Sequence, residues 1–231
     1  DPLTYPYTIT GYLNGDTSEA DLDYGVSIAR IAGEDVDTYT ITPSGALDPN
    51  YKITFIEATF TITQKELTIT PNSTQLKDYG ADDPMSYAYT VVPALEPFDY
   101  FTGSLSRVDG EVVGFYEIEI GDLYAGNNYK LEVASGVNFE IVPKKLTITP
   151  KYGQSKDYGQ DDPILLYDSS PSGETTIVFS GSLTREIGEN VGSYAITKGS
   201  LGVNSNYDLI FVSGINFEIK VATPTIDFDN I

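Results

Sequence analysis

The stretch KDYGADDP, at residues 77–84, recurs almost unchanged as KDYGQDDP at residues 156–163. Each copy contains a central glycine and ends on Asp-Pro. Glycine allows positive φ, and a residue that precedes proline favours an extended or turn conformation. The octapeptide therefore predicts a sharp loop between two strands, and its recurrence indicates that this loop has a fixed place in a repeated domain.

Other motifs recur at the same spacing, so the repetition is not confined to the octapeptide. The motif pairs with offsets of 78 or 79 residues are KELTITP (65–71) with KKLTITP (144–150), FTGSLSR (101–107) with FSGSLTR (179–185), and VNFEI (137–141) with INFEI (215–219). Asn-Tyr pairs, 78 residues apart each time, carry the same register into the N-terminal part, at residues 50–51, 128–129 and 206–207.

These offsets predict three domains with boundaries near residues 64–65 and 143–144. The expected repeats cover residues 1–64, 65–143 and 144–221, and residues 222–231 have the pattern of a further repeat's start or a linker. The first repeat keeps Asp1 and Pro2 but has no counterpart of KDYG. We therefore expect it to lack its first strand.

The local pattern within a repeat is that of β-strands. In GFYEIEI (114–120), the apolar residues Tyr116, Ile118 and Ile120 alternate with polar neighbours. Alternation with a period of two, interrupted by Gly, Pro, Asn and Asp, predicts half-buried antiparallel strands. The expected fold class is all-β, a tandem repeat of three small antiparallel β domains, most simply immunoglobulin-like sandwiches. A β-grasp-like domain with one short helix at residues 94–101 is the alternative.

Two tyrosines predict a particular corner in this fold. Tyr116 and Tyr194 each follow a glycine by two residues and precede an isoleucine by two. This spacing is similar to the tyrosine corner of immunoglobulin-like sandwiches. We expect both rings to be largely buried, with the hydroxyls bonded close to a strand corner.

Composition excludes several classes of function. The chain has 34 acidic and 13 basic residues, a net charge of −21, and contains neither cysteine nor histidine. The negative field repels nucleic acid and anionic membranes. The missing residue types exclude the usual zinc sites, the Ser-His-Asp triad and the Cys-His dyad. No run of 18 apolar residues occurs, so we expect no membrane insertion. We also expect no enzymatic activity, no cofactor, and a monomer.

The carboxylates of the octapeptide allow one alternative to a purely structural loop. A calcium ion could bind Asp78, Asp82 and Asp83 in one copy, and Asp157, Asp161 and Asp162 in the other. Calcium takes six to eight oxygen ligands, more than this loop supplies, so the structural loop is preferred and no metal site is assigned. Nearby, an arginine and a glutamate flank a glycine turn in each repeat, which predicts cross-turn ion pairs: Arg30 with Glu34, Arg107 with Glu111, and Arg185 with Glu189.

Taken together, the motifs resemble tandem MBG domains of the Tyr-Gly-X type. The resemblance rests on LTIT, KDYG-x-DDP, GSL-[ST]-R, GE-x-VG-x-Y, NY and NFEI, and it covers two whole repeats and most of the first. It implies a secreted or surface-anchored bacterial protein of adhesin type, with no catalytic residues to transfer. The expected role is an extracellular stalk that presents a binding head, with neighbouring repeats as its partners. The alternatives are repeats that themselves bind a glycan or a protein, and accessory modules of an extracellular enzyme.

Overall fold

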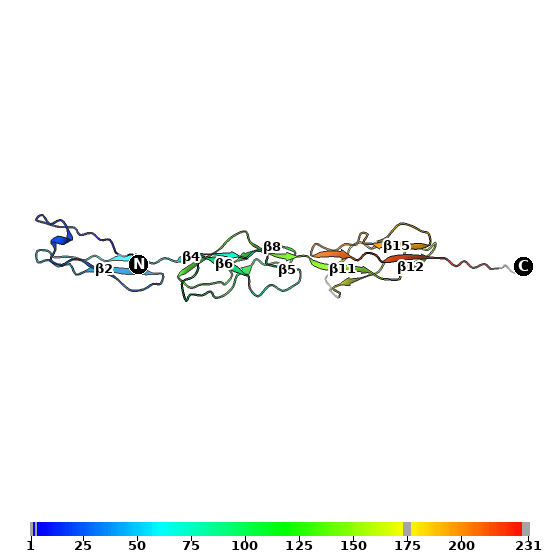
Figure 1. The fold of residues 1–231 in the computed structure, drawn as a ribbon, viewed down its shortest axis with the longest axis horizontal. Coiled ribbons are helices and arrows are strands. Elements are labelled where there is room, and N and C mark those ends of the chain that lie inside the picture. Colours follow the sequence, from blue (N-terminus) through cyan, green and yellow to red (C-terminus); the bar gives the residue numbers. More distant parts are fainter. Residues whose placement is uncertain (1, 3, 173–176, 228–231) are drawn as a thin grey trace. The chain divides into compact units, whose positions relative to one another are not determined.

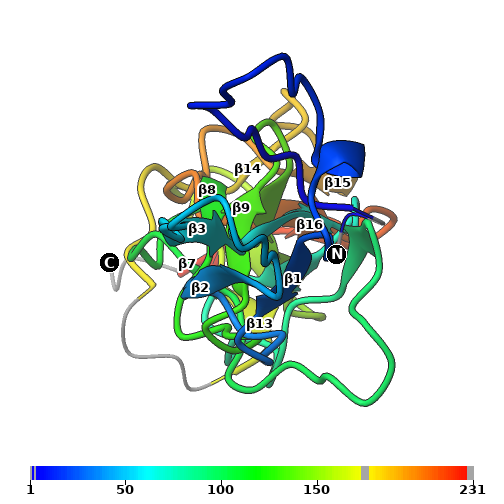
Figure 2. The same cartoon turned by 90° about the vertical axis from the view of Figure 1, so that its left-hand side faces the viewer.

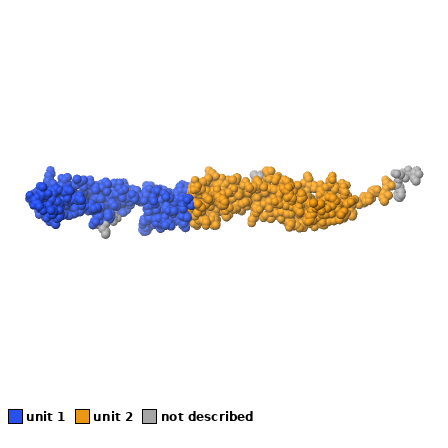
Figure 3. Space-filling model, turned by 90° about the horizontal axis from the view of Figure 1, so that it is seen from above, with its two compact units in different colours: residues 1–70, 89–105, 120–135 blue, residues 71–88, 106–119, 136–231 orange. Residues whose placement is uncertain are grey.

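The structure is a computed structural model, and it describes residues 2, 4–172 and 177–227. The chain divides into two compact units (Figure 3). Unit 1 comprises residues 1–70, 89–105 and 120–135, and unit 2 comprises residues 71–88, 106–119 and 136–231. The middle repeat therefore contributes to both units, and each unit contains one of the two junctions between repeats. The predicted domain boundaries near residues 64–65 and 143–144 remain a prediction.

Unit 1 forms two sheets within its described residues, ordered β1-β2-β3 and β6-β4-β9 (Figures 1 and 2). Its strands are β1 (Ser27–Arg30), β2 (Thr38–Ser44), β3 (Ala58–Thr61), β4 (Lys65–Pro71), β6 (Tyr89–Val92) and β9 (Tyr129–Val133). A short 3-10 helix, η1 (Glu19–Asp21), precedes β1. In β4 the side chains of Leu67, Ile69 and Pro71 are buried and alternate with exposed residues, as the sequence pattern predicts.

Unit 2 forms three sheets within its described residues, ordered β5-β10-β8-β7, β13-β11-β16 and β12-β17-β15-β14. Its strands from the middle repeat are β5 (Leu76–Asp78), β7 (Ser106–Arg107), β8 (Gly114–Glu119) and β10 (Asn138–Val142). Its strands from the last repeat are β11 (Lys144–Pro150), β12 (Ser155–Asp157), β13 (Tyr167–Ser170), β14 (Thr184–Arg185), β15 (Gly192–Thr197), β16 (Tyr207–Phe211) and β17 (Asn216–Lys220).

The sheets are mixed, which corrects the expectation of purely antiparallel domains. Consecutive strands such as β7 and β8 pair antiparallel, but the opening strands of a complete repeat pair parallel to its closing strands. The parallel pairs are β4 with β9, β5 with β10, β11 with β16, and β12 with β17. Antiparallel and parallel strands share the same side-chain alternation, so the sequence pattern does not distinguish them. The all-β class is confirmed, and the immunoglobulin-like sandwich remains a prediction.

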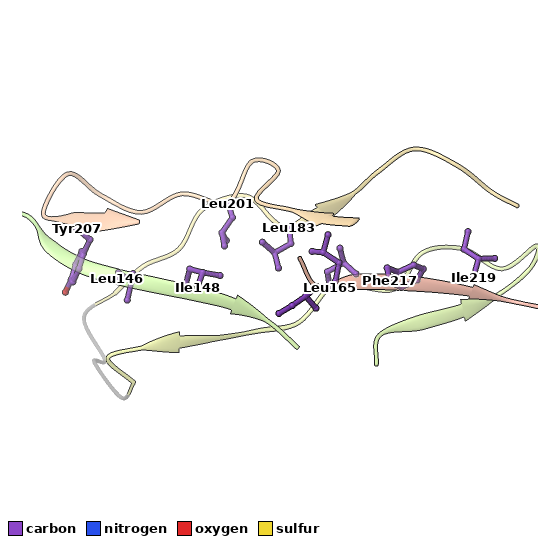
Figure 4. Packing of buried hydrophobic residues seen from close by; sticks show 10 residues of the cluster. Leu146, Ile148, Leu165, Leu183, Leu201, Tyr207, Phe217 and Ile219 are labelled. Carbon is purple, nitrogen blue, oxygen red and sulfur yellow. The ribbon is translucent and has the colours of Figure 1, made fainter. Parts of the chain in front are cut away.

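The core of the last repeat runs along this parallel arrangement. Leu146 and Ile148 of β11 and Phe217 and Ile219 of β17 are almost completely buried, and Leu201 joins them from a loop (Figure 4). Burial of each such side chain contributes about 1.5–3 kcal/mol. The alternating positions on both opening and closing strands therefore hold the two ends of the repeat's sequence together.

Two local predictions have different outcomes. Residues 94–101 form no helix; the segment follows a cis peptide bond between Val92 and Pro93 and continues as turns and extended chain. In the first repeat, β3 pairs with β2 and has no second partner among the described residues, whereas β10 and β17 each have two. The expected lack of a first strand remains a prediction, and Asp1 lies outside the described residues. Within the described part of the chain, no helix is long and apolar enough to span a membrane.

Candidate functional site

Arg107 connects the loops of the middle repeat and belongs to unit 2. Its Nη1 donates to the backbone oxygens of Val108 and Gly110, at 2.9 and 2.7 Å. Its Nη2 donates to Glu111 Oε1 at 2.7 Å. These contacts confirm the predicted cross-turn ion pair. They also fix the backbone of the glycine turn, because the planar guanidinium binds several acceptors at once.

The guanidinium also binds the octapeptide loop. Asp83 accepts two hydrogen bonds from Arg107, one from Nε at 2.7 Å and one from Nη2 at 3.0 Å. The ammonium of Lys77 lies 2.6 Å from Asp83 and 2.5 Å from Glu111. Only 5% of the Lys77 side chain and 6% of the Arg107 side chain is exposed, whereas 67% of the Glu111 side chain is. We call Lys77, Asp83, Arg107 and Glu111 the cation cage of the middle repeat.

Aromatic rings complete the surroundings of the buried guanidinium. The Cζ atom of Arg107 lies 4.9 Å from the centre of the Tyr116 ring and 5.4 Å from that of Phe139. A cation over an aromatic face is stabilised by the ring quadrupole, by about 0.5–2 kcal/mol depending on exposure. The Tyr87 hydroxyl donates to Asp83 at 3.0 Å. One arginine thus links β7, the octapeptide loop, the glycine turn, β8 and β10.

The last repeat contains the same cage, built from Lys156, Asp162, Arg185 and Glu189. Arg185 donates to Asp162 at 2.8 and 2.9 Å and to Glu189 at 2.8 Å. Its Cζ atom lies 5.1 Å from the Tyr194 ring centre and 5.5 Å from that of Phe217. Lys156 binds both carboxylates, and 5% of its side chain is exposed. Two independent copies therefore have one geometry.

The first repeat, in unit 1, retains the arginine half of the cage. Arg30 donates to Glu34 at 2.8 Å and to the backbone oxygen of Gly33 at 2.8 Å. Its Cζ atom lies 5.0 Å from the Tyr39 ring centre and 5.4 Å from that of Phe60. The sequence offers no counterpart of Lys77 in this repeat.

The cages hold their groups in the charged state. Hydrogen bonds from Arg107 and then Lys77 keep the pKa of Asp83 well below its usual range, although burial acts in the opposite direction. Lys77 and Arg107 also lower the pKa of Glu111. Burial lowers the pKa of Lys77, but its bonds to Asp83 and Glu111 outweigh this effect, so the pKa is raised. Burial and the bond to Asp83 raise the pKa of Tyr87 to about 12.

The cages include two of the aspartates that were considered as calcium ligands. Asp83 and Asp162 are each bound by a lysine and an arginine of the same repeat. The other candidates, Asp78, Asp82, Asp157 and Asp161, do not gather with them, and no group of three His, Cys, Asp or Glu suited to a metal ion occurs in the described residues. Sequence reasoning missed the roles of Lys77, Lys156 and Tyr87. The recurrence of the lysine and the arginine in both complete repeats was the available signal.

The tyrosine corner is present in a modified form. Tyr116 and Tyr194 donate to the backbone oxygens of Val112 and Asn190, at 2.7 and 2.8 Å. Both tyrosines are partly buried, and their hydroxyls bind the backbone beside the glycine turn, as expected for the corner. One face of each ring is covered by an arginine. A Cβ atom at Gly110 would lie 2.2 Å from the Tyr116 ring, so this glycine is required for the close approach.

Each junction between repeats is formed around the asparagine of an Asn-Tyr pair. In unit 2, Asn206 accepts hydrogen bonds from the backbone of Val113, through its Oδ1 at 3.1 Å, and of Lys144, through its carbonyl at 3.0 Å. In unit 1, Asn128 does the same with Val36 at 2.8 Å and Lys65 at 2.9 Å. The asparagine therefore connects its own repeat to the turn of the preceding one.

A family model for the MBG domain of the YGX type matches the chain three times, at residues 1–61, 67–139 and 146–217. The chain belongs to this family. The matches contain both cation cages. MBG domains are a non-catalytic repeat type, in keeping with cages in which each cation is paired with two carboxylates of the same repeat. No curated protein matches the sequence.

Proposed function

We propose that the chain is a non-catalytic repeat region of a secreted or cell-surface, adhesin-like protein, and that its MBG repeats act as a stalk that presents another part of that protein. The observation that carries the proposal is the parallel pairing of the opening and closing strands in a complete repeat. The membership of the family supports the extracellular location.

The parallel pairing determines how the chain passes through a repeat. In the last repeat, residues 144–157 run beside residues 207–220 in the same direction. The entry at Lys144 and the exit at Lys220 consequently lie at opposite ends of the repeat. The seven residues of β11 and the three of β12 cover about 33 Å of extended chain, so each repeat adds length instead of returning the chain to its starting point.

The junction in unit 2 supports the same role, because it has no flexible linker. Pro143 is the one residue between β10 and β11, and proline has a fixed φ and no amide hydrogen. Asn206 binds both sides of this junction, and the rings of Tyr79 and Tyr207 meet edge to face at 5.4 Å across it. Such contacts restrict rotation about the junction.

Small-angle X-ray scattering of the chain in solution tests the proposal. We expect a maximum dimension on the order of 100 Å, because three repeats each add about 35–45 Å. A matched variant carries a Gly-Ser insertion between Val142 and Pro143, and we expect its distance distribution to become shorter and broader. A maximum dimension near that of a compact globule, about 60 Å, or identical profiles for both proteins, would contradict the stalk.

A second candidate function is ligand binding by the middle repeat. Phe98 is 100% exposed and Tyr100 is 73% exposed, on a single loop of unit 1. Phe98 has φ of 76°, a strained conformation for a residue with a side chain, and such strain is concentrated at functional sites. Glu96 and Asp99 of the same loop line a cavity of about 360 Å³. Exposed aromatic rings next to carboxylates suit the faces and hydroxyls of a sugar.

Binding to a panel of immobilised oligosaccharides tests this candidate. The informative variant is the double substitution Phe98→Ser and Tyr100→Ser, because neither side chain is part of the core. The matched control is Tyr152→Ser, which removes a ring that is 82% exposed on a different repeat. Binding that is lost in the first variant and kept in the second supports the candidate, and the absence of binding by the unaltered chain removes it.

A further inference from the structure

The last repeat contains two successive parallel strand pairs, β11 with β16 and β12 with β17, which lie in different sheets but share one register, and we call the two pairs together the parallel ribbon. The residues Lys144–Ile148 of β11 each pair with a residue 63 positions further along the chain, and β12 pairs with β17 at the same offset. The last two residues of β11, Thr149 and Pro150, pair with β13. Backbone hydrogen bonds extend the pairing beyond the strands: Lys144 to Asn206, Val212 to Ile148, Glu218 to Gln154, and Tyr158 to Lys220. The opening segment, residues 144–157, is thus bonded to the closing segment, residues 207–220, near both of its ends, with a turn at residues 152–153 between the two strand pairs.

Tension on the two ends of the repeat acts on this ribbon in one specific way. A load pulls Lys144 towards the N-terminus and Lys220 towards the C-terminus, so the paired strands are pulled past each other along their own axes. The bonds between the strands run across this direction. All of them must therefore yield together. Strands loaded from the same end would instead separate one bond at a time.

The cation cage prevents these strands from sliding. Lys156 lies in β12, directly opposite Ile219 of β17. Its ammonium binds Asp162 and Glu189, and Glu189 precedes β15, the other neighbour of β17. A shift of β12 by one register step would withdraw the ammonium from both carboxylates into a nearly dry position. Leaving a buried charge without its partner is strongly unfavourable.

We propose that the complete repeat is a load-bearing element, in which the parallel ribbon resists tension in shear and the Lys156 cage fixes its register. This property goes beyond the spacing role, because a spacer does not need to resist force. The middle repeat also has two parallel strand pairs with one shared offset: β4 pairs with β9, and β5 pairs with β10, each at 64 positions. Lys77 of β5 has the position of Lys156.

Single-molecule pulling on the whole chain, with cysteine handles at two loading geometries, tests the proposal. The chain contains no cysteine, so the handles are unique. The shear geometry uses Lys145→Cys with Lys220→Cys, at opposite ends of the ribbon. The peeling geometry uses Lys145→Cys with Asp208→Cys, which face each other at one end. All three native side chains are exposed, and both geometries break the same ribbon.

We expect the unfolding force of the last repeat to be several-fold higher in the shear geometry than in the peeling geometry. Equal forces in the two geometries would overturn the proposal. This comparison alters no buried residue, so it does not depend on whether a core variant folds. It is also independent of the scattering test, because a repeat can resist shear whether or not the whole chain is extended.

The role of the cage is tested in the shear geometry with Lys156→Met, which keeps the apolar stem and removes the charge. Lys151→Met is the matched control, because Lys151 is half exposed and its ion pair with Asp168 is long, at 3.4 Å. We expect a clear loss of unfolding force in the first variant and no change in the second. Equal forces for Lys156→Met and the unaltered chain would remove the cage from the proposal.

Discussion

At the scale of single residues, the arginine of each repeat does more than the sequence indicates. Arg107 and Arg185 each bind two carboxylates and two backbone carbonyls, and each lies against two aromatic rings. A lysine could not reproduce this pattern, because its ammonium is a compact point charge without the planar fork of donors. The neighbouring glycine and tyrosine serve the same arrangement, and both can be tested separately.

The substitution Gly110→Ala should destabilise the chain because the new methyl group would meet the Tyr116 ring at 2.2 Å. We expect a loss of about 1–3 kcal/mol in the free energy of unfolding, the usual range for overpacking. Gly114→Ala is the matched control, since Gly114 has nearly the same φ, 158° against 154°, and no atom within 4 Å of the added carbon. Urea unfolding of both variants measures the difference, and equal losses would show that backbone strain, not the ring contact, determines the cost.

The substitution Tyr116→Phe should remove a single hydrogen bond while leaving the ring beneath Arg107. The hydroxyl donates to the backbone oxygen of Val112 at 2.7 Å, and the bond is accessible to solvent. We therefore expect a loss of about 0.5–1 kcal/mol. Tyr152→Phe, at a ring that is 82% exposed, is the control. If neither substitution alters the urea midpoint, the corner tyrosine contributes through its ring alone.

At the scale of elements, the sequence predicts which residues face the core better than it predicts which strands are neighbours. Leu146, Ile148, Phe217 and Ile219 are buried as their alternation indicates. The same alternation fits parallel and antiparallel partners equally well, so the parallel ribbon was not predicted. The contact between Lys156 and Glu189 was also missed, because it joins residues 33 positions apart that are brought together by the pairing of both β12 and β15 with β17. Local pattern does not encode such a pairing.

The cages should make stability depend on acid pH. Hydrogen bonds with the buried cations lower the pKa of Asp83, Glu111, Asp162 and Glu189 in the folded state. Their contribution is fully present above the ordinary carboxyl pKa of about 4 and is lost as the pH falls through the lowered folded values. We expect the urea midpoint to change little between pH 5 and 8 and to fall below about pH 4.

The double variant Asp83→Asn and Asp162→Asn should have a lower midpoint at neutral pH and a weaker decline in acid. A double variant with Asp109→Asn and Asp208→Asn, which removes exposed carboxylates outside the cages, is the control and should keep the decline of the unaltered chain. An unchanged acid decline in the first variant would contradict the role assigned to the cages.

The charged state of the cage also predicts that its lysine and aspartate do not form a covalent bond. The Nζ atom of Lys77 lies 2.6 Å from Oδ1 of Asp83, close enough for condensation to an amide with loss of water. Condensation requires a neutral amine and a protonated acid, whereas the raised pKa of Lys77 and the lowered pKa of Asp83 keep both groups ionised. Intact-mass spectrometry should therefore give the mass of the unmodified sequence. A species lighter by one or two water molecules would show that the cages are reactive.

At the scale of the whole molecule, the account depends on the junctions. The repeat period and the three copies were predictable from the sequence, since the motifs recur at constant offsets. The role of the Asn-Tyr pair at the junction was not predictable, because the bond joins Asn206 to Val113, which lies 93 positions earlier in the chain. The net charge of −21 adds only a weak, screened repulsion between repeats. The direct contacts at the junction are therefore the feature that a stalk requires.

The rigidity of the junction in unit 2 is the most direct test of this account. Spin labels on Glu117→Cys and Asp208→Cys, both exposed in the native chain and on either side of Pro143, report the distance between the two repeats by pulsed electron resonance. We expect a single narrow distance distribution, and a broad one after Gly-Ser insertion between Val142 and Pro143. A broad distribution in the chain without the insertion would show that neighbouring repeats move freely, and would contradict the proposal that they form a stalk.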